Sequence, residues 1–140
     1  MKEKHLLLII LLAAAVLLFA YSWLPGGLDA DSCHYAVVSE EILRSQKLLG
    51  FYDPIYGGVF FYHFPFALWV TAAFFKLFGI SNFSATLFSI LCGFILTAVL
   101  FYFGRFLKNQ WVGFFAGMSF LLTNHIVRIS RKCRMDIPVS

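Results

Sequence analysis

Long apolar runs without ionised side chains dominate the chain, and one polar segment interrupts them. The runs cover residues 5–28, 77–104 and 109–127. Each approaches or exceeds the roughly 20 apolar residues that cross a bilayer as a helix. Because a helix satisfies its own backbone hydrogen bonds in hydrocarbon, the pattern predicts an all-α fold, namely a polytopic α-helical membrane protein.

The predicted organisation is part of one transmembrane domain over residues 1–140. It consists of a first membrane helix at 6–23, an external loop with juxtamembrane helices at 24–80, and membrane helices at 84–104 and 111–127. The first apolar stretch is longer than the core of a typical signal peptide and ends without a small-x-small cleavage site. We therefore expect an uncleaved first helix whose N-terminus is cytoplasmic.

The polar segment at 28–63 has a local charge balance of −3 from five carboxylates and two basic residues. Within it, residues 32–49 are expected to be helical and to be ended by Gly50. Two turns are expected after it, at Asp53-Pro54 and Gly57-Gly58. The predicted buried face of the helix is formed by Tyr35, Val38, Ile42 and Leu49.

The short apolar segment at 65–79 leaves two topologies open, because it is bounded by Pro and Gly and contains Lys76. If it spans the membrane, seven Lys and Arg residues are cytoplasmic and four are external; if it lies along the outer surface, these numbers are reversed. The positive-inside rule favours spanning. A basic cluster that binds phosphate externally would favour the surface position.

Composition excludes an ordinary soluble domain, since 61% of the residues are hydrophobic and only 13% are charged, against roughly 25% charged in soluble proteins. The net charge of +4 comes from basic residues at the ends of apolar runs. No nucleic-acid partner is therefore expected. The three cysteines form no CxxC pair, so neither a zinc site nor a complete disulfide framework is indicated.

Two carboxylates, Asp29 and Asp31, follow the first membrane helix and suggest a metal site or a general base. A simpler interpretation is that they stabilise the N-terminus of the helix that begins near Ser32. A calcium loop is excluded, because His34 occupies the position that requires glycine.

The stretch LDADSCHYA at 28–36 resembles the first external loop of C-type glycosyltransferases, the polyprenyl-phosphate-dependent group that includes aminoarabinose transferases and protein O-mannosyltransferases. Asp31 matches the catalytic aspartate of that family. Ser32 stands where many members have Glu. The segment YHFPFALW at 62–69 is similar to the family's Lys-Pro-Pro-Leu or His-Pro-Pro-Leu motif, and His63 falls on its basic position.

Two later segments extend the resemblance over residues 28–140. LFGIS at 77–81 is similar to the family's Leu-Phe-Gly-x-Ser turn. Ser130-Arg131, ahead of Asp136, resembles the motif in which a second acidic residue faces the first. The resemblance implies that Asp31 and Asp136 are catalytic, and that they hold the metal if one is required. It also implies that His63, Arg131 and Arg134 bind the lipid phosphate.

The implied function is transfer of a sugar from a polyprenyl-phosphate carrier to a lipid, protein or glycan acceptor at the non-cytoplasmic face of a bacterial or archaeal cell membrane. The sequence does not specify a cofactor, and a divalent cation stays an option. We expect an N-terminal fragment that carries half a site and is inactive alone. The alternatives are a non-catalytic small membrane protein and a transporter subunit, although the charges avoid the centres of the clear spans.

Overall fold

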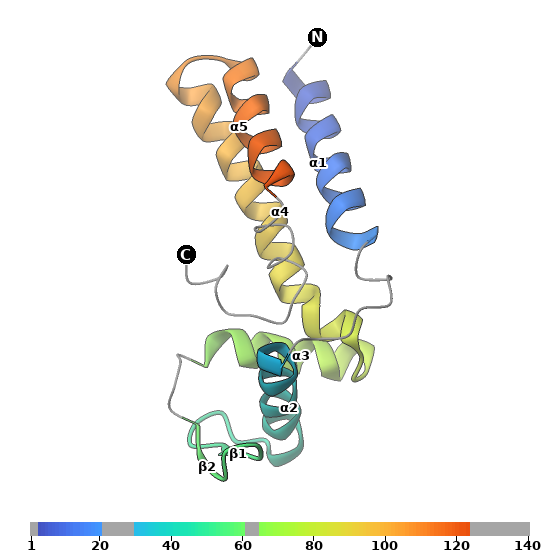
Figure 1. Cartoon of the computed structure of the whole chain (residues 1–140), viewed down its shortest axis with the longest axis vertical. Coiled ribbons are helices and arrows are strands. Elements are labelled where there is room, and N and C mark those ends of the chain that lie inside the picture. The colour runs from blue at the N-terminus through green and yellow to red at the C-terminus, as the bar shows by residue number, and fades with distance from the viewer. Residues whose placement is uncertain (1–2, 21–29, 61–64, 124–140) are drawn as a thin grey trace.

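The computed structural model describes residues 3–20, 30–60 and 65–123. Its helices form two packed parts (Figure 1). The first part, called the bundle, is formed by three apolar helices. The second part, called the cap, lies at one end of the bundle. The C-terminal part of the chain, from residue 124 onward, is outside the described residues.

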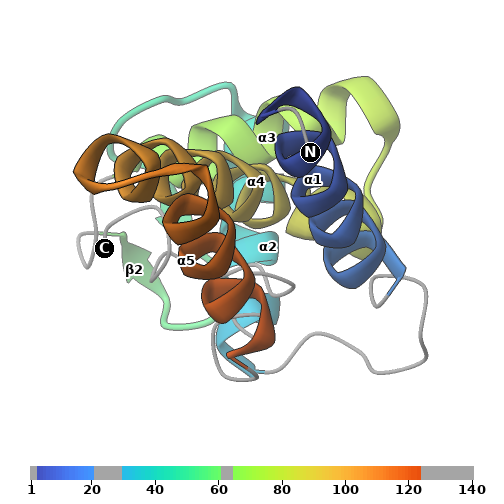
Figure 2. The same ribbon diagram turned by 90° about the horizontal axis from the view of Figure 1, so that it is seen from above.

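The bundle consists of α1 (Glu3–Ala20), α4 (Asn82–Leu107) and α5 (Gln110–Leu122), which contact one another pairwise (Figure 2). In α1, apolar residues four positions apart share one buried stripe. The buried core of the bundle is formed by Leu6, Ile10, Ala14, Ile90, Phe101, Phe120 and Leu121. Other faces of the helices expose large apolar side chains such as Val16 and Ile95. The bundle is therefore apolar on its outside as well as in its core.

Helix α4 contains 26 residues and is, within the described ranges, the one helix that is long and apolar enough to cross a membrane. It begins at a capping box in which the side chains of Ser81 and Ser84 each accept the other residue's backbone N–H. It covers the predicted membrane helix at 84–104. Helix α5 covers part of the one predicted at 111–127, whose remainder falls outside the described residues.

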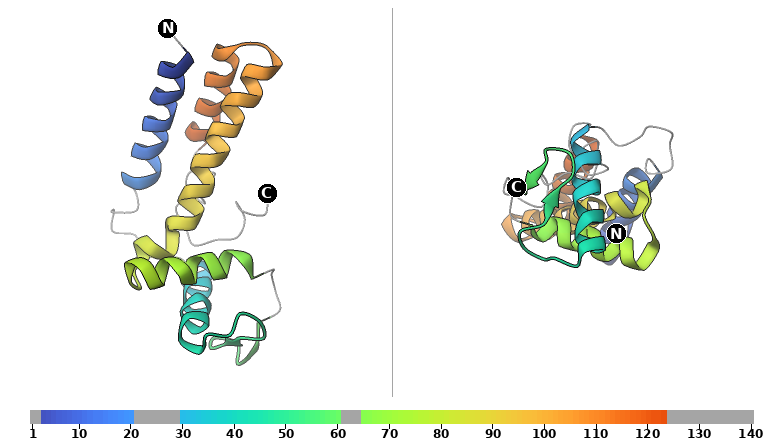
Figure 3. Two further views of the ribbon diagram at one scale, coloured as in Figure 1. Left: turned by 180° about the vertical axis from the view of Figure 1, so that it is seen from behind. Right: turned by 90° about the horizontal axis from the view of Figure 1, so that it is seen from below.

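Helix α3 (Phe66–Phe78) runs across the end of α4 instead of lying beside it (Figures 1 and 3). It belongs to the segment for which the sequence leaves two topologies open. Gly79 ends the helix with a φ of 80°, a backbone conformation that favours glycine, and the chain then turns into α4. The structure therefore places α3 crosswise to the bundle.

The cap is completed by α2 (Ala30–Ser45) and by a hairpin of two short antiparallel strands, β1 (Tyr52–Asp53) and β2 (Gly58–Val59). Helix α2 packs against α3 on the side away from the bundle (Figure 3). The turns predicted at Asp53-Pro54 and Gly57-Gly58 form this hairpin. The cap core is formed by Val38, Ile42, Phe51, Phe60, Ala67, Leu68 and Ala72.

The predicted end of the helix at Gly50 is wrong. Helix α2 ends at Ser45, because Gln46 takes a left-handed φ of 55° while its N–H still donates to the carbonyl of Ile42. Leu49 lies beyond this break and is exposed, so it does not extend the buried face of the helix. Val38 and Ile42 are buried as expected.

Candidate active site

Asp31, the first predicted catalytic residue, lies in the first turn of α2 and is exposed. A carboxylate at this position interacts favourably with the positive end of the helix dipole. The helix thus holds the Asp31 carboxylate in the cap, near solvent, where a substrate can reach it.

The other predicted site residues, His63, Arg131, Arg134 and Asp136, fall outside the described residues. Within residues 3–20, 30–60 and 65–123, no group of three or more His, Cys, Asp or Glu side chains is arranged to hold a metal ion.

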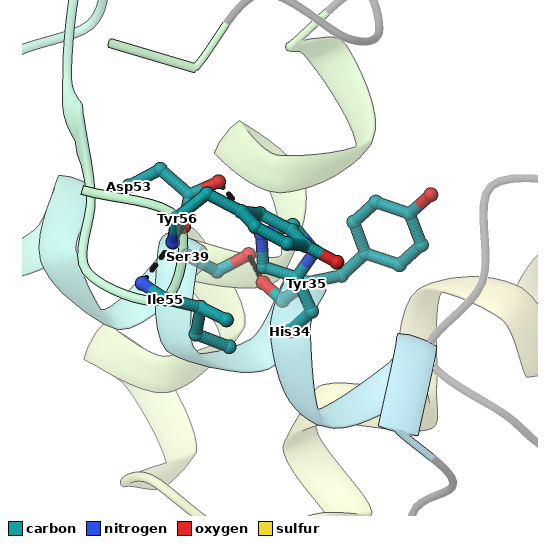
Figure 4. A network of polar contacts seen from close by, with 6 residues as sticks. All are labelled: His34, Tyr35, Ser39, Asp53, Ile55 and Tyr56. Carbon is teal, nitrogen blue, oxygen red and sulfur yellow. Dashed lines mark hydrogen bonds and ion pairs between the residues drawn. The ribbon is translucent and has the colours of Figure 1, made fainter. Parts of the chain in front are cut away.

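The structure adds a pair of residues that sequence reasoning missed. His34 of α2 and Asp53 of β1 are 19 positions apart, and Nε2 of His34 lies 2.8 Å from Oδ2 of Asp53 (Figure 4). The Asp53 side chain is 1% exposed and that of His34 is 14% exposed. The hairpin therefore brings a buried carboxylate against an imidazole at the edge of the cap.

The Asp53 carboxylate accepts further hydrogen bonds from its own turn. Its Oδ1 accepts the backbone N–H groups of Ile55, at 3.0 Å, and of Tyr56, at 3.3 Å. Burial by itself would raise the pKa of Asp53, but the hydrogen bonds from His34, Ile55 and Tyr56 outweigh it. The pKa is lowered from its ordinary value of 3.8. Asp53 is consequently an ionised, buried carboxylate at neutral pH.

Aromatic rings fix the plane of the His34 imidazole. Tyr35 stacks on it with a ring-centroid distance of 5.7 Å, and Tyr56 meets it edge-on at 4.9 Å. Phe60, which directly follows β2, approaches edge-on at 5.9 Å. The imidazole is therefore constrained both by a hydrogen bond and by ring contacts.

The sequence contains one signal for His34 but none for its contact with Asp53. His34 follows Asp31 by three positions, so a helix places the two residues on the same face. The partner Asp53 belongs to an Asp-Pro turn, where aspartate is common for local reasons. Nothing local connects Asp53 with His34, because their contact depends on how the hairpin folds back onto α2.

Comparison with known families identifies the class of protein as a membrane glycosyltransferase. The family model of dolichyl-phosphate-mannose-protein mannosyltransferases matches residues 62–140, more than half of the chain, and the chain belongs to this family. The family consists of membrane glycosyltransferases that use a lipid-linked sugar donor. This confirms the resemblance to C-type glycosyltransferases.

The matched range begins after α2 and the hairpin, so Asp31, His34 and Asp53 lie outside it. It includes α3, α4 and α5. No curated protein and no solved structure matches the chain.

Proposed function

We propose that the chain is part of an integral-membrane glycosyltransferase that moves a sugar from a polyprenyl-phosphate carrier to an acceptor at the non-cytoplasmic face. The observation that carries the proposal is the exposed carboxylate of Asp31 in a cap next to the apolar bundle, in a chain of this family. A lipid-linked donor has its phosphate and sugar at the membrane surface, which is where such a cap would meet them.

In the proposed reaction, Asp31 acts as the general base and takes the proton of the acceptor hydroxyl. The acceptor oxygen forms a bond with the anomeric carbon, while the bond between that carbon and the phosphate oxygen breaks. The negative charge stays on the departing lipid phosphate, where His63, Arg131 and Arg134 stabilise it. Asp136 orients the acceptor or a divalent cation.

We also propose the topology in which α3 lies along the outer membrane surface. Its crosswise position relative to α4 supports this alternative over the spanning one. Arg105 and Lys108 are then cytoplasmic, together with the N-terminus, and the basic residues at 128–134 are external. Phosphate binding gives that cluster a physical reason to depart from the positive-inside rule.

The decisive experiment for catalysis is transfer from a labelled polyprenyl-phosphate sugar by the full-length gene product carrying Asp31→Asn. We expect a loss of about 100-fold or more, in line with the contribution of a general base. Glu40→Gln is the matched control, since Glu40 lies on the same helix and pairs with Arg44 at the surface. Near-normal transfer by Asp31→Asn, with Glu40→Gln unchanged, would remove Asp31 from the mechanism.

The topology can be tested with a membrane-impermeant thiol reagent in sealed cells. Cys33 is exposed on α2 and is the natural external probe. In a background without other cysteines, we expect Cys33 to be labelled in intact cells and Lys108→Cys, combined with Cys33→Ser, to be labelled only after lysis. Labelling of both positions from the same side would contradict the proposed arrangement.

A further inference from the structure

The end of the bundle opposite the cap carries basic residues on the connection between α4 and α5. Arg105 lies in the last turn of α4 and Lys108 directly follows this helix, and both side chains are exposed. Helix α1 begins at the same end, with Glu3 and Lys4 in its first turn (Figures 1 and 3). Neither α4 nor α5 contains Asp or Glu. Among the described elements, this end therefore has three basic residues against one acidic residue.

Exposed aromatic side chains adjoin this basic connection. Trp111, the second residue of α5, is 45% exposed, and Tyr102, near the end of α4, is 48% exposed. Phe106, between them in the sequence, is 86% exposed. Trp and Tyr are enriched at the boundary between hydrocarbon and headgroups, because their rings are apolar and also carry a group that binds water. The connection thus combines the two kinds of residue that anchor a protein at a membrane surface.

The length of α4 agrees with this position. Tyr102 precedes Lys108 by six residues, or about 9 Å along a helix, which is close to the roughly 5–8 Å that headgroups occupy on each side of a bilayer. About 20 residues of helix cross the hydrocarbon core. Counting that many residues back from Tyr102 reaches Asn82, the first residue of α4, where α3 crosses the bundle. One register of α4 therefore places the basic connection at one membrane surface and the cap at the other.

The positive charge at the connection belongs to side chains and not to the N-terminus of α5. The Asn109 side chain accepts the backbone N–H groups of Trp111 and Val112, both at 3.0 Å, and the Asn109 carbonyl accepts that of Gly113. These three N–H groups are occupied, whereas an anion site at a helix N-terminus needs them open. An anion at this end would meet the guanidinium of Arg105 and the ammonium of Lys108, both of which suit phosphate groups.

We propose that the α4–α5 connection binds the headgroup of an anionic phospholipid through Arg105 and Lys108, with Trp111 at the headgroup boundary, and that this contact sets the depth of the bundle. The inference rests on the part of the proposed function that places the bundle in a membrane. The ligand is a lipid because large exposed apolar side chains, Phe106 and Leu107, lie between the two charges in the sequence. In the proposed topology this surface meets the cytoplasmic leaflet, whose anionic lipids attract basic residues next to membrane helices.

The test measures which lipid gathers at the connection in nanodiscs that contain the full-length gene product. A donor fluorophore is attached to Val112→Cys in a background without other cysteines, because Val112 is exposed beside the basic residues. Energy transfer is compared between phosphatidylglycerol and phosphatidylcholine, each labelled with the same acceptor on an acyl chain and present at the same mole fraction. The comparison gives the relative association constant of the anionic lipid. We expect phosphatidylglycerol to be favoured about tenfold or more.

Substitutions show whether the charges cause this preference. Arg105→Gln and Lys108→Gln should each lower the relative association constant about fivefold, the factor that corresponds to one basic residue at an anionic surface. Arg105→Lys keeps the charge and should retain most of the preference. Lys47→Gln is the matched control, because Lys47 is an exposed basic residue of the cap. An equal effect of Lys47→Gln, or no effect of either substitution at the connection, would overturn the proposal.

Salt and a soluble competitor provide readouts that a merely structural role would not move. The preference should fall as sodium chloride rises from about 0.1 M to about 1 M, because the screening length falls from roughly 10 Å to roughly 3 Å. Inorganic phosphate should compete no better than chloride at the same ionic strength. Stronger competition would identify a site for free phosphate and would contradict the proposal. If both Gln variants fail to fold, the wild type decides, since equal association of the two lipids, or a preference that salt leaves unchanged, overturns the inference.

The lipid measurement and the transfer assay fail independently. Asp31→Asn should lose transfer and keep the preference for phosphatidylglycerol, since Asp31 lies in the cap at the opposite end of the bundle. Retained transfer by Asp31→Asn overturns the proposed function. Equal association of the two lipids in the wild type, together with loss of transfer by Asp31→Asn, overturns only the inference.

Discussion

Gly113 of α5 faces the backbone carbonyl oxygen of Phe101 in α4 so closely that a β-carbon has no room between them. Close by, a β-carbon on Gly104 of α4 would come within 2.7 Å of the α-carbon of Gly113. The two helix backbones therefore touch directly near the α4–α5 connection. Because backbone atoms cannot move aside as a flexible side chain does, this contact fixes how closely the helices pack.

We predict that Gly113→Ala destabilises the protein by about 1–3 kcal/mol or more, the usual cost of overpacking. The added methyl would meet the Phe101 carbonyl oxygen and the Arg105 amide nitrogen. Thermal unfolding of the detergent-solubilised protein measures the effect. Gly58→Ala is the control, because no atom lies within 4 Å of its added β-carbon. Equal unfolding temperatures for the two variants would contradict the close contact.

A second glycine of α5, Gly117, lies against a flexible side chain instead of against backbone. A β-carbon at Gly117 would meet Cδ1 of Ile10 in α1, which is the end of a flexible side chain. We predict that Gly117→Ala destabilises the protein and that Ile10→Val, which removes Cδ1, relieves part of this loss. The two substitutions should therefore be non-additive by about 0.5 kcal/mol or more in a double-mutant cycle. Strict additivity would show that α1 does not pack on Gly117 as described.

The cap is held together by a hydrogen bond between distant segments. Trp69 of α3 donates its Nε1–H to the carbonyl of Leu48, at 2.8 Å, in the loop that follows α2. Trp69→Phe removes the donor, and we expect a loss of about 1 kcal/mol that loosens this loop. Limited trypsin cleavage after the exposed Lys47 should become about fivefold faster, which is the same free energy expressed as a rate. Trp111→Phe, in α5, should leave the cleavage rate unchanged.

Asp53 makes the stability of the cap depend on pH. Its pKa is lowered in the folded protein, so the unfolded state binds more protons on acidification and folding stability rises with pH. This contribution is complete above the unfolded pKa of about 4 and is lost as pH falls through the folded pKa. We predict that Asp53→Asn has a lower unfolding temperature at neutral pH and a shallower decline between about pH 5 and pH 3.

The control for this pH dependence is Glu40→Gln, whose carboxylate pairs with Arg44 on the surface of α2. A surface pair of this kind contributes little to stability, so its acid profile should follow that of the wild type. Parallel acid profiles for Asp53→Asn and the wild type would show that the buried carboxylate gains nothing from His34 and the turn.

The sequence predicts the parts of the candidate site that depend on neighbouring residues, and it does not predict contacts between distant segments. The pattern around Asp31 predicts a carboxylate at the start of a helix, and Asp31 lies in the first turn of α2, whereas its catalytic role stays a prediction. In the sequence pattern, His34 only excludes a calcium loop, and no local feature indicates its contact with Asp53. The early end of α2 at Gln46 has no signal in the sequence either, because a left-handed backbone at a residue other than glycine or asparagine is uncommon and leaves no pattern.

The sequence by itself determined that the chain is mainly helical, where most of its helices lie and that they are apolar, because these properties depend on the order of residues within each segment. The tertiary structure decided that α3 runs across the end of α4 and that Asp53 meets His34. The apolar segment at 65–79 is compatible with either orientation, and its direction is set by packing against α2 and α4. The His34–Asp53 contact likewise requires Phe51 and Phe60 to bury the hairpin against α2, which joins residues too far apart for any local pattern to connect.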